Sequence, residues 1–213
     1  MLWLRADMGV TLGTGVSAWA DQSGSGNNVT QATGSAQPTF SAAGAPNGLP
    51  CLSYASASQQ VLASAGPVLG PTSWTIFTVH QFASTAGSFG FFSNGSGTGG
   101  QNWSLEVDGG NREILLQGST TQTDGAATAS WEQWTAQQQG AGNNTIFRVN
   151  GTLKTLTNPT AHRTIISGPT LIGEAWGYGY MNGNVAEVIA YNAILSASQI
   201  QEVESYLAGK YGV

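Results

Sequence analysis

The segment from residue 182 to residue 212 constrains the fold of this chain more than any other. Residues 185–191 alternate with a period of two, and apolar side chains occupy both faces of the pattern. This arrangement is typical of an inner strand in layered sheets, because such a strand is buried on both sides. Asn192 and Ala193 then interrupt the pattern. The sequence therefore predicts a core strand at 185–191.

A helix start follows that strand. Ser196 precedes Gln199 by three residues, which is the spacing of a capping box. Lys210 stands where a cation favours a helix C-terminus, and Gly209 or Gly212 can end the helix. One apolar stripe marks the face that we expect to be buried, and it consists of Ile200, Val203 and Leu207. The chain is therefore predicted to end with a short amphipathic helix.

These segments resemble a family of known domains. The matching runs are GNVAEVIAYN (183–192) and ESYLAGKYG (204–212) at the end, LWLRAD (2–7) and VSAWADQSGSGN (16–27) at the start, and NGLPCLSY (47–54) and FRVNG (147–151) between them. They resemble laminin-G-like, concanavalin A-like lectin/glucanase jelly-roll domains, in the branch found in bacterial surface proteins and phage structural proteins. The resemblance implies one domain over 1–213, an all-β two-sheet jelly-roll sandwich with a short C-terminal α-helix. This fold hosts lectins, glycosidases and interaction modules, so it leaves the function open.

The rest of the chain agrees with a sandwich. Many short alternating segments are separated by turns, which favours stacked sheets over a βαβ arrangement. Asn150-Gly151 is a strong hairpin-turn signal. Two stretches are predicted to be irregular, a polar connection at 30–48 and a glycine-rich loop at 93–101. The predicted strands include 74–82, 103–108, 112–117, 131–138, 145–149 and 152–157, and 170–173 leads to the final strand.

Composition excludes some classes of partner. The net charge is −5 and the six basic residues are scattered, whereas nucleic acid requires clustered Lys and Arg. An anionic membrane surface is disfavoured for the same reason, and the chain lacks the run of about 18 apolar residues that membrane insertion needs. Met1 is followed almost at once by the first predicted strand, without a leader-like segment. We therefore expect a virion component assembled without secretion, with a trimmed piece of a secreted protein as the competing interpretation.

No catalytic residues are predicted. The best carboxylate group is Glu106 and Asp108 with Glu113. Retaining glycosidases need their two carboxyl groups close together, which in this fold means one strand face. Glu113 lies beyond a Gly-Gly turn on the next predicted strand, so we expect a solvated hairpin end there and no enzyme.

One loop offers hard oxygen ligands for calcium. Asp21, Ser23 and Asn27 lie in a turn, and Asp7 is a further candidate ligand. The competing interpretation is an Asx-turn, in which Asp21 accepts hydrogen bonds from its own loop. A bound calcium ion is thus a candidate cofactor, and no cofactor is expected to be required.

Ligand binding is predicted at an aromatic loop. Trp176, Tyr178 and Tyr180 alternate with glycines, and such rings stack on sugars or enter a partner's groove. They can equally form an aromatic lid over a sheet. Glu187 shares its strand face with apolar residues, so it either accepts structural hydrogen bonds or faces a ligand groove.

The sequence as a whole indicates a non-enzymatic recognition or structural module. The leading prediction is a phage virion surface protein, a head decoration or host-attachment protein, whose partner is a capsid or tail protein. The alternative is an extracellular carbohydrate-binding module of a secreted bacterial protein, whose partner is a cell-surface glycan. A glycoside hydrolase is disfavoured by the carboxylate spacing. Homo-oligomers are left open, because sheet edges can pair.

Overall fold

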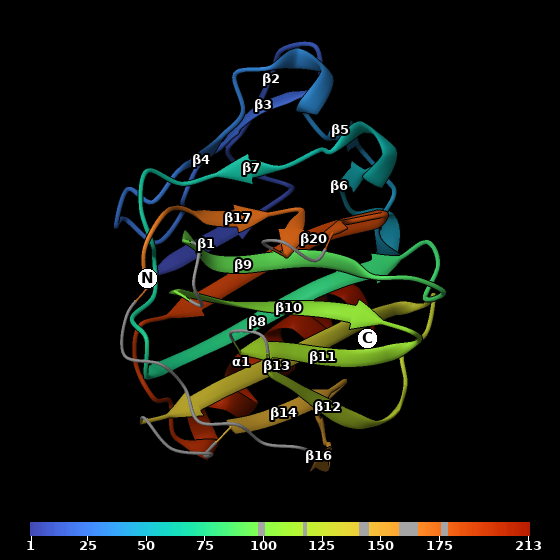
Figure 1. Cartoon of the computed structure of the whole chain (residues 1–213). Helices are drawn as coiled ribbons and strands as arrows, with labels where there is room; N and C mark the ends of the chain where they lie inside the picture. Colours follow the sequence, from blue (N-terminus) through green and yellow to red (C-terminus); the bar gives the residue numbers. More distant parts are fainter. Residues whose placement is uncertain (98–100, 117–118, 141–144, 158–165, 176–178) are drawn as a thin grey trace.

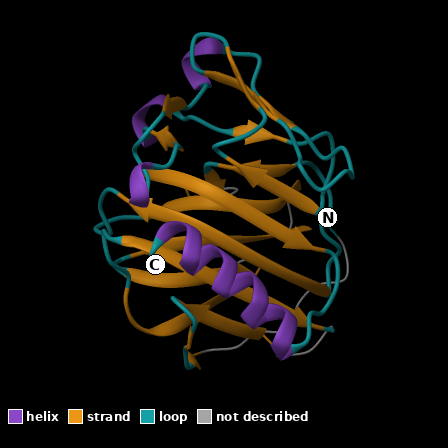
Figure 2. Cartoon of the chain, turned by 180° about the vertical axis from the view of Figure 1, so that it is seen from behind, coloured by secondary structure: helices purple, strands orange, loops and turns teal. Residues whose placement is uncertain are grey.

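The computed structural model describes residues 1–97, 101–116, 119–140, 145–157, 166–175 and 179–213, with backbone alone at 96–97, 101–102, 111–116 and 119–125. Two antiparallel sheets stack face to face, and one α-helix lies outside them (Figure 1). The helix α1 (Ala197–Tyr211) crosses the back of the rear sheet (Figure 2). The predicted all-β sandwich with a C-terminal helix is therefore confirmed.

The described strands of the rear sheet number eight. The spatial order is β15 (Thr152–Leu153), β14 (Thr145–Val149), β13 (Trp131–Gln139), β8 (Ser73–Phe82), β20 (Gly183–Tyr191), β6 (Cys51–Tyr54) and β5 (Thr39–Ser41). The eighth strand, β1 (Leu2–Arg5), pairs with β20 beside β6. The first and last strands of the chain are therefore hydrogen-bonded neighbours.

The front sheet contains ten strands among the described residues. Their order is β16 (Leu156–Thr157), β12 (Ser119–Ala126), β11 (Asn111–Leu116), β10 (Gln101–Asp108), β9 (Phe89–Gly97), β17 (Thr170–Ile172), β7 (Leu62–Ala63), β4 (Val29–Thr30), β3 (Val16–Trp19) and β2 (Val10–Leu12). A small hairpin of β18 (Glu174–Ala175) and β19 (Gly179–Tyr180) contacts β9, and short 3₁₀ turns occupy Gly34–Ala36, Pro46–Gly48 and Ser56–Ser58.

Two apolar layers hold these elements together. The first fills the space between the sheets, where Trp74 of the rear sheet stacks on Trp103 of the front sheet with ring centroids 3.8 Å apart. The second lies under α1, where Phe77 and Ile189 of the rear sheet pack against Leu207. β8 and β20 are buried on both faces, which explains their apolar residues on both sides of the period-two pattern.

The helix begins and ends as the sequence predicts. Ser196 is the N-cap of a complete capping box with Gln199, and Gly212 closes the C-terminus with φ +73°. The buried face is wider than the predicted stripe, because Glu204 and Tyr211 are buried beside Ile200 and Leu207. A buried carboxylate requires hydrogen-bond donors, and Glu204 has two, Thr135 and Arg148.

Two predicted irregular segments contain strands. The expected loop at 93–101 is wrong, because β9 continues to Gly97 and Gly97 pairs with Gln101 of β10. Polar residues belong in this strand because Ser93 and Asn94 are buried and bonded to Gly95 and Leu69. The connection at 30–48 likewise contains β5. Within the described residues, no helix is long and apolar enough to cross a bilayer.

Candidate functional site

A groove runs along the outer face of the rear sheet, between α1 and strands β13 to β15. Its volume is about 690 Å³. We call it the helix groove, and its polar lining includes Gln133, Gln137, Arg148, Asn150, Gln201 and Glu204.

Strand alternation places the amides in this groove. Along β13, Trp134 and Ala136 belong to the core between the sheets, so Gln133 and Gln137 face the helix. Arg148 on β14 is the register partner of Thr135, which brings it to the same face. The groove is therefore built by the helix and by the neighbouring strands β13, β14 and β15, which are distant from the helix in sequence.

Gln133 is the most unusual residue of the groove. The residue is 1% exposed, and its Nε2 atom has no hydrogen-bond partner among the described residues. The backbone around it is fixed, because its N–H donates to Asn150 Oδ1 at 2.7 Å and its carbonyl accepts from Asn150 N at 2.9 Å. Buried polar atoms without a partner cost about 1–3 kcal/mol, so most are satisfied in folded proteins. Gln133 is therefore the residue of the groove whose polar side chain is least satisfied by the described residues.

The charges of the groove are paired with each other. Arg148 Nε donates to Glu204 Oε1 at 2.8 Å, and Thr135 Oγ1 donates to the same oxygen at 2.8 Å. Arg148 Nη2 also donates to the carbonyl of Gly151 at 2.5 Å. Arg148 and Glu204 are the only charged side chains among the described lining residues. The groove consequently presents amide and hydroxyl groups beside apolar residues such as Ile146, Leu153 and Ile200, and its described side chains carry no net charge.

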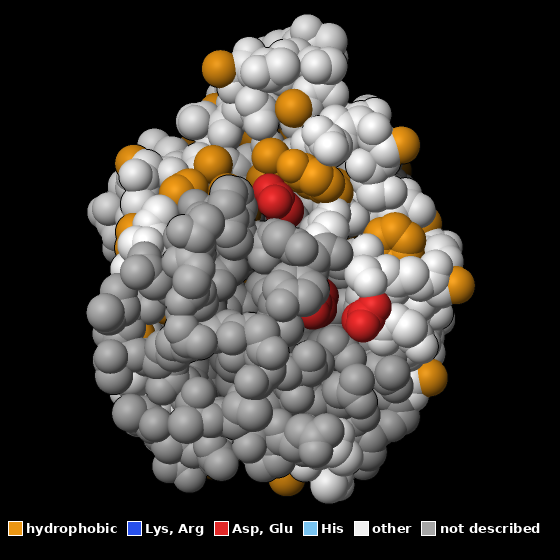
Figure 3. All heavy atoms as spheres, viewed as in Figure 1, with side chains coloured by type: hydrophobic (Ala, Val, Ile, Leu, Met, Phe, Trp, Pro, Cys, Tyr) orange, Lys and Arg blue, Asp and Glu red, His pale blue; other side chains and the backbone are white. Residues whose placement is uncertain are grey.

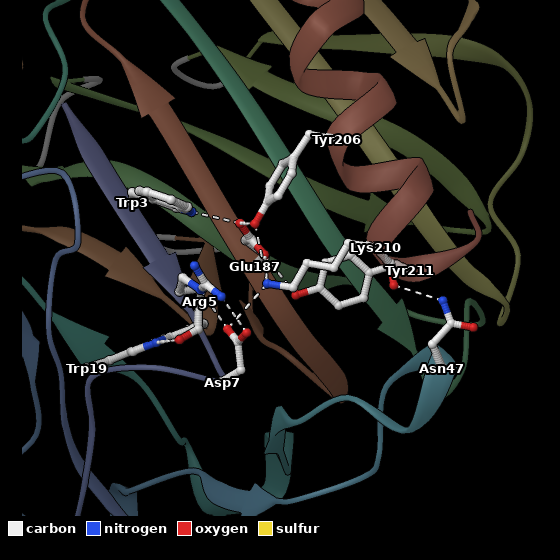
Figure 4. A network of polar contacts seen from close by, with 9 residues as sticks. All are labelled: Trp3, Arg5, Asp7, Trp19, Asn47, Glu187, Tyr206, Lys210 and Tyr211. Atoms are coloured by element: carbon white, nitrogen blue, oxygen red, sulfur yellow. Dashed lines mark hydrogen bonds and ion pairs between the residues drawn. The ribbon is translucent and has the colours of Figure 1, made fainter.

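Glu187 lies under α1 and is not among the residues that line the helix groove. Its carboxylate is fully buried and accepts four hydrogen bonds, from Trp3 Nε1 (2.7 Å), Tyr206 OH (3.1 Å), Lys210 Nζ (2.7 Å) and Tyr211 OH (2.9 Å). Figure 4 shows these groups converging from β1 and from the helix. The arrangement fits the structural interpretation of Glu187, and its role in ligand binding stays a prediction.

A second ion pair extends this network to the N-terminal strand. Arg5 donates to both carboxylate oxygens of Asp7, at 2.8 and 2.6 Å, and Lys210 Nζ lies 3.3 Å from Asp7 Oδ1 (Figure 4). The hydrogen bond from Arg5, aided by the charge of Lys210, lowers the pKa of Asp7 to about 2. The helix end is therefore tied to β1 and β20 by charged contacts.

The predicted aromatic loop is described only in part. Trp176 and Tyr178 lie outside the described residues, so their predicted ligand-binding role stays a prediction. Tyr180 on β19 pairs with Glu174 on β18, and burial raises the pKa of Glu174. This hairpin crosses β9 at Gly90, where a Cβ atom would lie 2.0 Å from the Cβ of Ala175.

The front of the molecule shows acidic and apolar side chains and no Lys or Arg in its described part (Figure 3). The candidate carboxylates for catalysis belong to the front sheet. Glu106 is the register partner of Glu113, which confirms that they lie on different strands. The expected solvated hairpin end is wrong for Glu106, which is 2% exposed, and right for Asp108, which is exposed. The side chain of Glu113 is outside the described set, so the absence of catalysis stays a prediction.

The structure brings the predicted calcium ligands together as a hydrogen-bonded turn. Asp21 Oδ1 accepts from the backbone N–H groups of Trp3 and Ser23, both at 2.9 Å. Asp21 Oδ2 accepts from Ser23 Oγ at 2.8 Å and from Asn27 N at 3.0 Å. These bonds match the Asx-turn interpretation, and calcium binding by Asp21, Ser23 and Asn27 stays a prediction.

Comparison with known proteins shows the fold. No family model matches the sequence, and no curated protein matches it either. One similar structure belongs to a study of botulinum neurotoxin type C, whose cell entry depends on interaction with two ganglioside molecules. It is 10% identical to this chain, and the TM-score is 0.63 over 97% of this chain and 51% of the toxin structure. Trypanosoma rangeli sialidase in complex with the inhibitor DANA is similar at 12% identity, with a TM-score of 0.65 over 95% of this chain and 32% of the enzyme.

A third similar structure is a free-standing binding module. The CBM40 of the Ruminococcus gnavus IT-sialidase, bound to α2,3-sialyllactose, is 14% identical, with a TM-score of 0.51 over 63% of this chain and 84% of the module. The chain thus has the β-sandwich fold shared by lectin-like binding domains and by domains of sialidases. It spans about half of the toxin structure and about a third of the sialidase.

Proposed function

We propose that this protein is a carbohydrate-binding module with a concanavalin A-like jelly-roll fold, and that the helix groove holds the glycan. The observation that carries the proposal is Gln133, which lines the groove and whose buried Nε2 atom has no hydrogen-bond partner among the described residues. The similar lectin-like structures support it, because two of them are described with gangliosides or sialyllactose.

The chemistry of the groove suits hydroxyl groups. A sugar hydroxyl both donates and accepts, and amide side chains offer both roles in one planar group. Gln201 and Ser205 line the helix side, opposite Gln133 and Asn150 on the strand side. A volume of about 690 Å³ falls within the usual range for small-ligand sites, roughly 300–1,000 Å³.

The ligand should be uncharged where it enters the groove. Arg148 is the only cationic side chain among the described lining residues, and its guanidinium already bonds Glu204 and Gly151. A carboxylate group of the ligand would approach Glu204 as well as Arg148, so it would gain little from the pair. We therefore expect neutral sugars to bind, unlike the sialylated ligand of the Ruminococcus module.

The test measures affinity and stability together. The purified protein is screened on an array that contains neutral glycans and their sialylated counterparts, and calorimetry follows on the best neutral ligand. Gln133→Leu removes the free amide, and we expect a Kd about tenfold weaker with little change in thermal stability, since a lost hydrogen bond is worth about 0.5–1.5 kcal/mol.

The matched control is Gln138→Leu on the same strand. Gln138 is buried on the opposite face, where it donates to Gly140 O at 2.7 Å and accepts from Thr145 Oγ1 at 2.6 Å. This variant should lose stability and keep its affinity. Equal affinity of the wild type and Gln133→Leu, or stronger binding of the sialylated glycans, would contradict the proposed groove.

A virion surface location, a capsid or tail partner and a homo-oligomer rank below the glycan-binding module, because no contact among the described residues favours them. Calcium at the Asp21 turn is tested by thermal unfolding with calcium and with a chelator, where a rise in Tm that Asp21→Asn abolishes would support it. The proposed absence of catalysis is tested by incubating the glycan ligands with the protein and analysing the products.

A further inference from the structure

A smaller pocket lies on the other side of α1. It has a volume of about 270 Å³ and shares no lining residue with the helix groove. We call it the aromatic pocket, and its lining consists of Met1, Trp3, Ile189, Tyr191, Glu202, Val203 and Tyr206.

Two aromatic rings form its walls at a right angle. The ring centroids of Trp3 and Tyr206 are 6.5 Å apart and their planes meet at 82°. Both rings are held by their polar atoms, since Trp3 Nε1 and Tyr206 OH donate to the same oxygen of the buried Glu187 (Figure 4). With these polar atoms engaged by Glu187, mainly the carbon surfaces of the rings are left for a ligand. Their positions are set before a ligand arrives, which lowers the entropy cost of binding.

One acidic side chain and two aromatic rings meet at the pocket. Glu202 is exposed and is the only charged side chain among the described lining residues. Both rings already contact a cation that is not among the lining residues, because the guanidinium carbon of Arg5 lies 5.5 Å from the centroid of Trp3 and Lys210 Nζ lies 5.8 Å from that of Tyr206. A ligand cation would therefore use the ring surfaces that face the pocket. Aromatic faces attract cations through their quadrupole, and the attraction grows when the cation is poorly hydrated.

We propose that the aromatic pocket binds a quaternary ammonium group. Such a group is compact, cationic and weakly hydrated, so it can contact two perpendicular rings at once while Glu202 balances its charge. A flat sugar ring instead requires one broad open face. The volume of about 270 Å³ lies just below the usual range for drug-sized ligands, which suits a single head group.

The experiment compares two molecules of nearly the same shape. Choline and its uncharged analogue 3,3-dimethyl-1-butanol are titrated separately into ¹⁵N-labelled protein, and amide chemical shifts give the Kd values. Choline should shift the amides of Glu202, Val203 and Tyr206 and bind at least about tenfold more tightly than the analogue.

Two variants separate charge from shape. Glu202→Gln should weaken choline several-fold and leave the analogue unchanged, whereas the control Asp108→Asn, a carboxylate on the front sheet, should change neither. Tyr206→Phe keeps the ring and should keep choline binding, while Tyr206→Leu should lose it. Equal affinity for choline and the analogue, or shifts that map outside the pocket, would overturn the proposal, as would methyl glucoside shifting the same amides when choline does not.

Discussion

The replacement of Glu187 by Gln is the sharpest test of how α1 is held on the sheet. In the wild type each carboxylate oxygen accepts two hydrogen bonds, Oε1 from Trp3 and Tyr206 and Oε2 from Lys210 and Tyr211. A glutamine amide keeps one of the two oxygens and places N–H donors where the other stood. The two groups that donated to the replaced oxygen then face the amide N–H₂ group, which is itself a donor. Lys210 also loses its closest anion.

The expected loss follows from these contacts. Removing one partner of a buried ion pair costs about 3–5 kcal/mol, because the remaining charge is left without compensation. The free energy of unfolding of a typical domain is about 5–15 kcal/mol, so Glu187→Gln should remove a large part of it. For a chain of this length, the melting temperature should fall by roughly 6–20 °C.

Urea unfolding followed by circular dichroism measures the loss, with Glu202→Gln as the control. Glu202 is exposed on the same helix, so its variant should stay within about 0.5 kcal/mol of the wild type. A double-mutant cycle with Lys210→Met then isolates the ion pair, because the second substitution should cost little once Glu187 is gone. A loss below about 1 kcal/mol in Glu187→Gln would refute the idea that this network anchors the helix.

Three further predictions concern other contacts. The pKa of Asp7 is lowered to about 2, chiefly by its hydrogen bond with Arg5. The stability that Asp7 contributes is therefore present above about pH 4 and is lost as the pH falls toward 2. Between pH 4 and pH 2, the urea midpoint should fall less in Asp7→Asn than in the wild type. Asn150 has φ +47° and its side chain accepts from Gln133 N, so Asn150→Ala should cost about 1–3 kcal/mol by urea unfolding and Asn150→Gly less, unless the turn contributes nothing. Gly90→Ala should cost about 3 kcal/mol in a thermal melt because its Cβ would meet Ala175, while Gly66→Ala, where no atom lies within 4 Å, should be nearly neutral; equal melts would contradict the close crossing at β9.

Local patterns carried the elements that the sequence predicted correctly. The capping box of Ser196 and Gln199 is confirmed, and it could be predicted because its contacts lie within four residues. The Asn150-Gly151 turn is also confirmed, since φ is +47° at Asn150 and +72° at Gly151. Burial on both faces of β20 could also be predicted, because apolar residues occupy both sides of its period-two pattern. Such features depend on neighbours in sequence, so one chain suffices to predict them.

The helix groove could not be predicted in the same way. Gln133, Arg148 and Glu204 meet only because β13 and β14 adopt one register and α1 docks across them. The amide-rich run at 133, 137, 138 and 139 was a signal, yet alternation alone does not tell which face of a strand a helix will cover. The partners of Glu187 were equally hidden, because Trp3 is 184 residues away in sequence.

That separation has a consequence for how the protein is made. Among the described strands, β1 is synthesised first and its partner β20 last. Until β20 is synthesised, one edge of β8 has unpaired backbone N–H and C=O groups, and its apolar side chains are not yet covered. Such an edge can pair with a wrong strand. The rear sheet therefore closes late, and a nascent chain that stalls before residue 183 should depend on chaperones more than its finished form does.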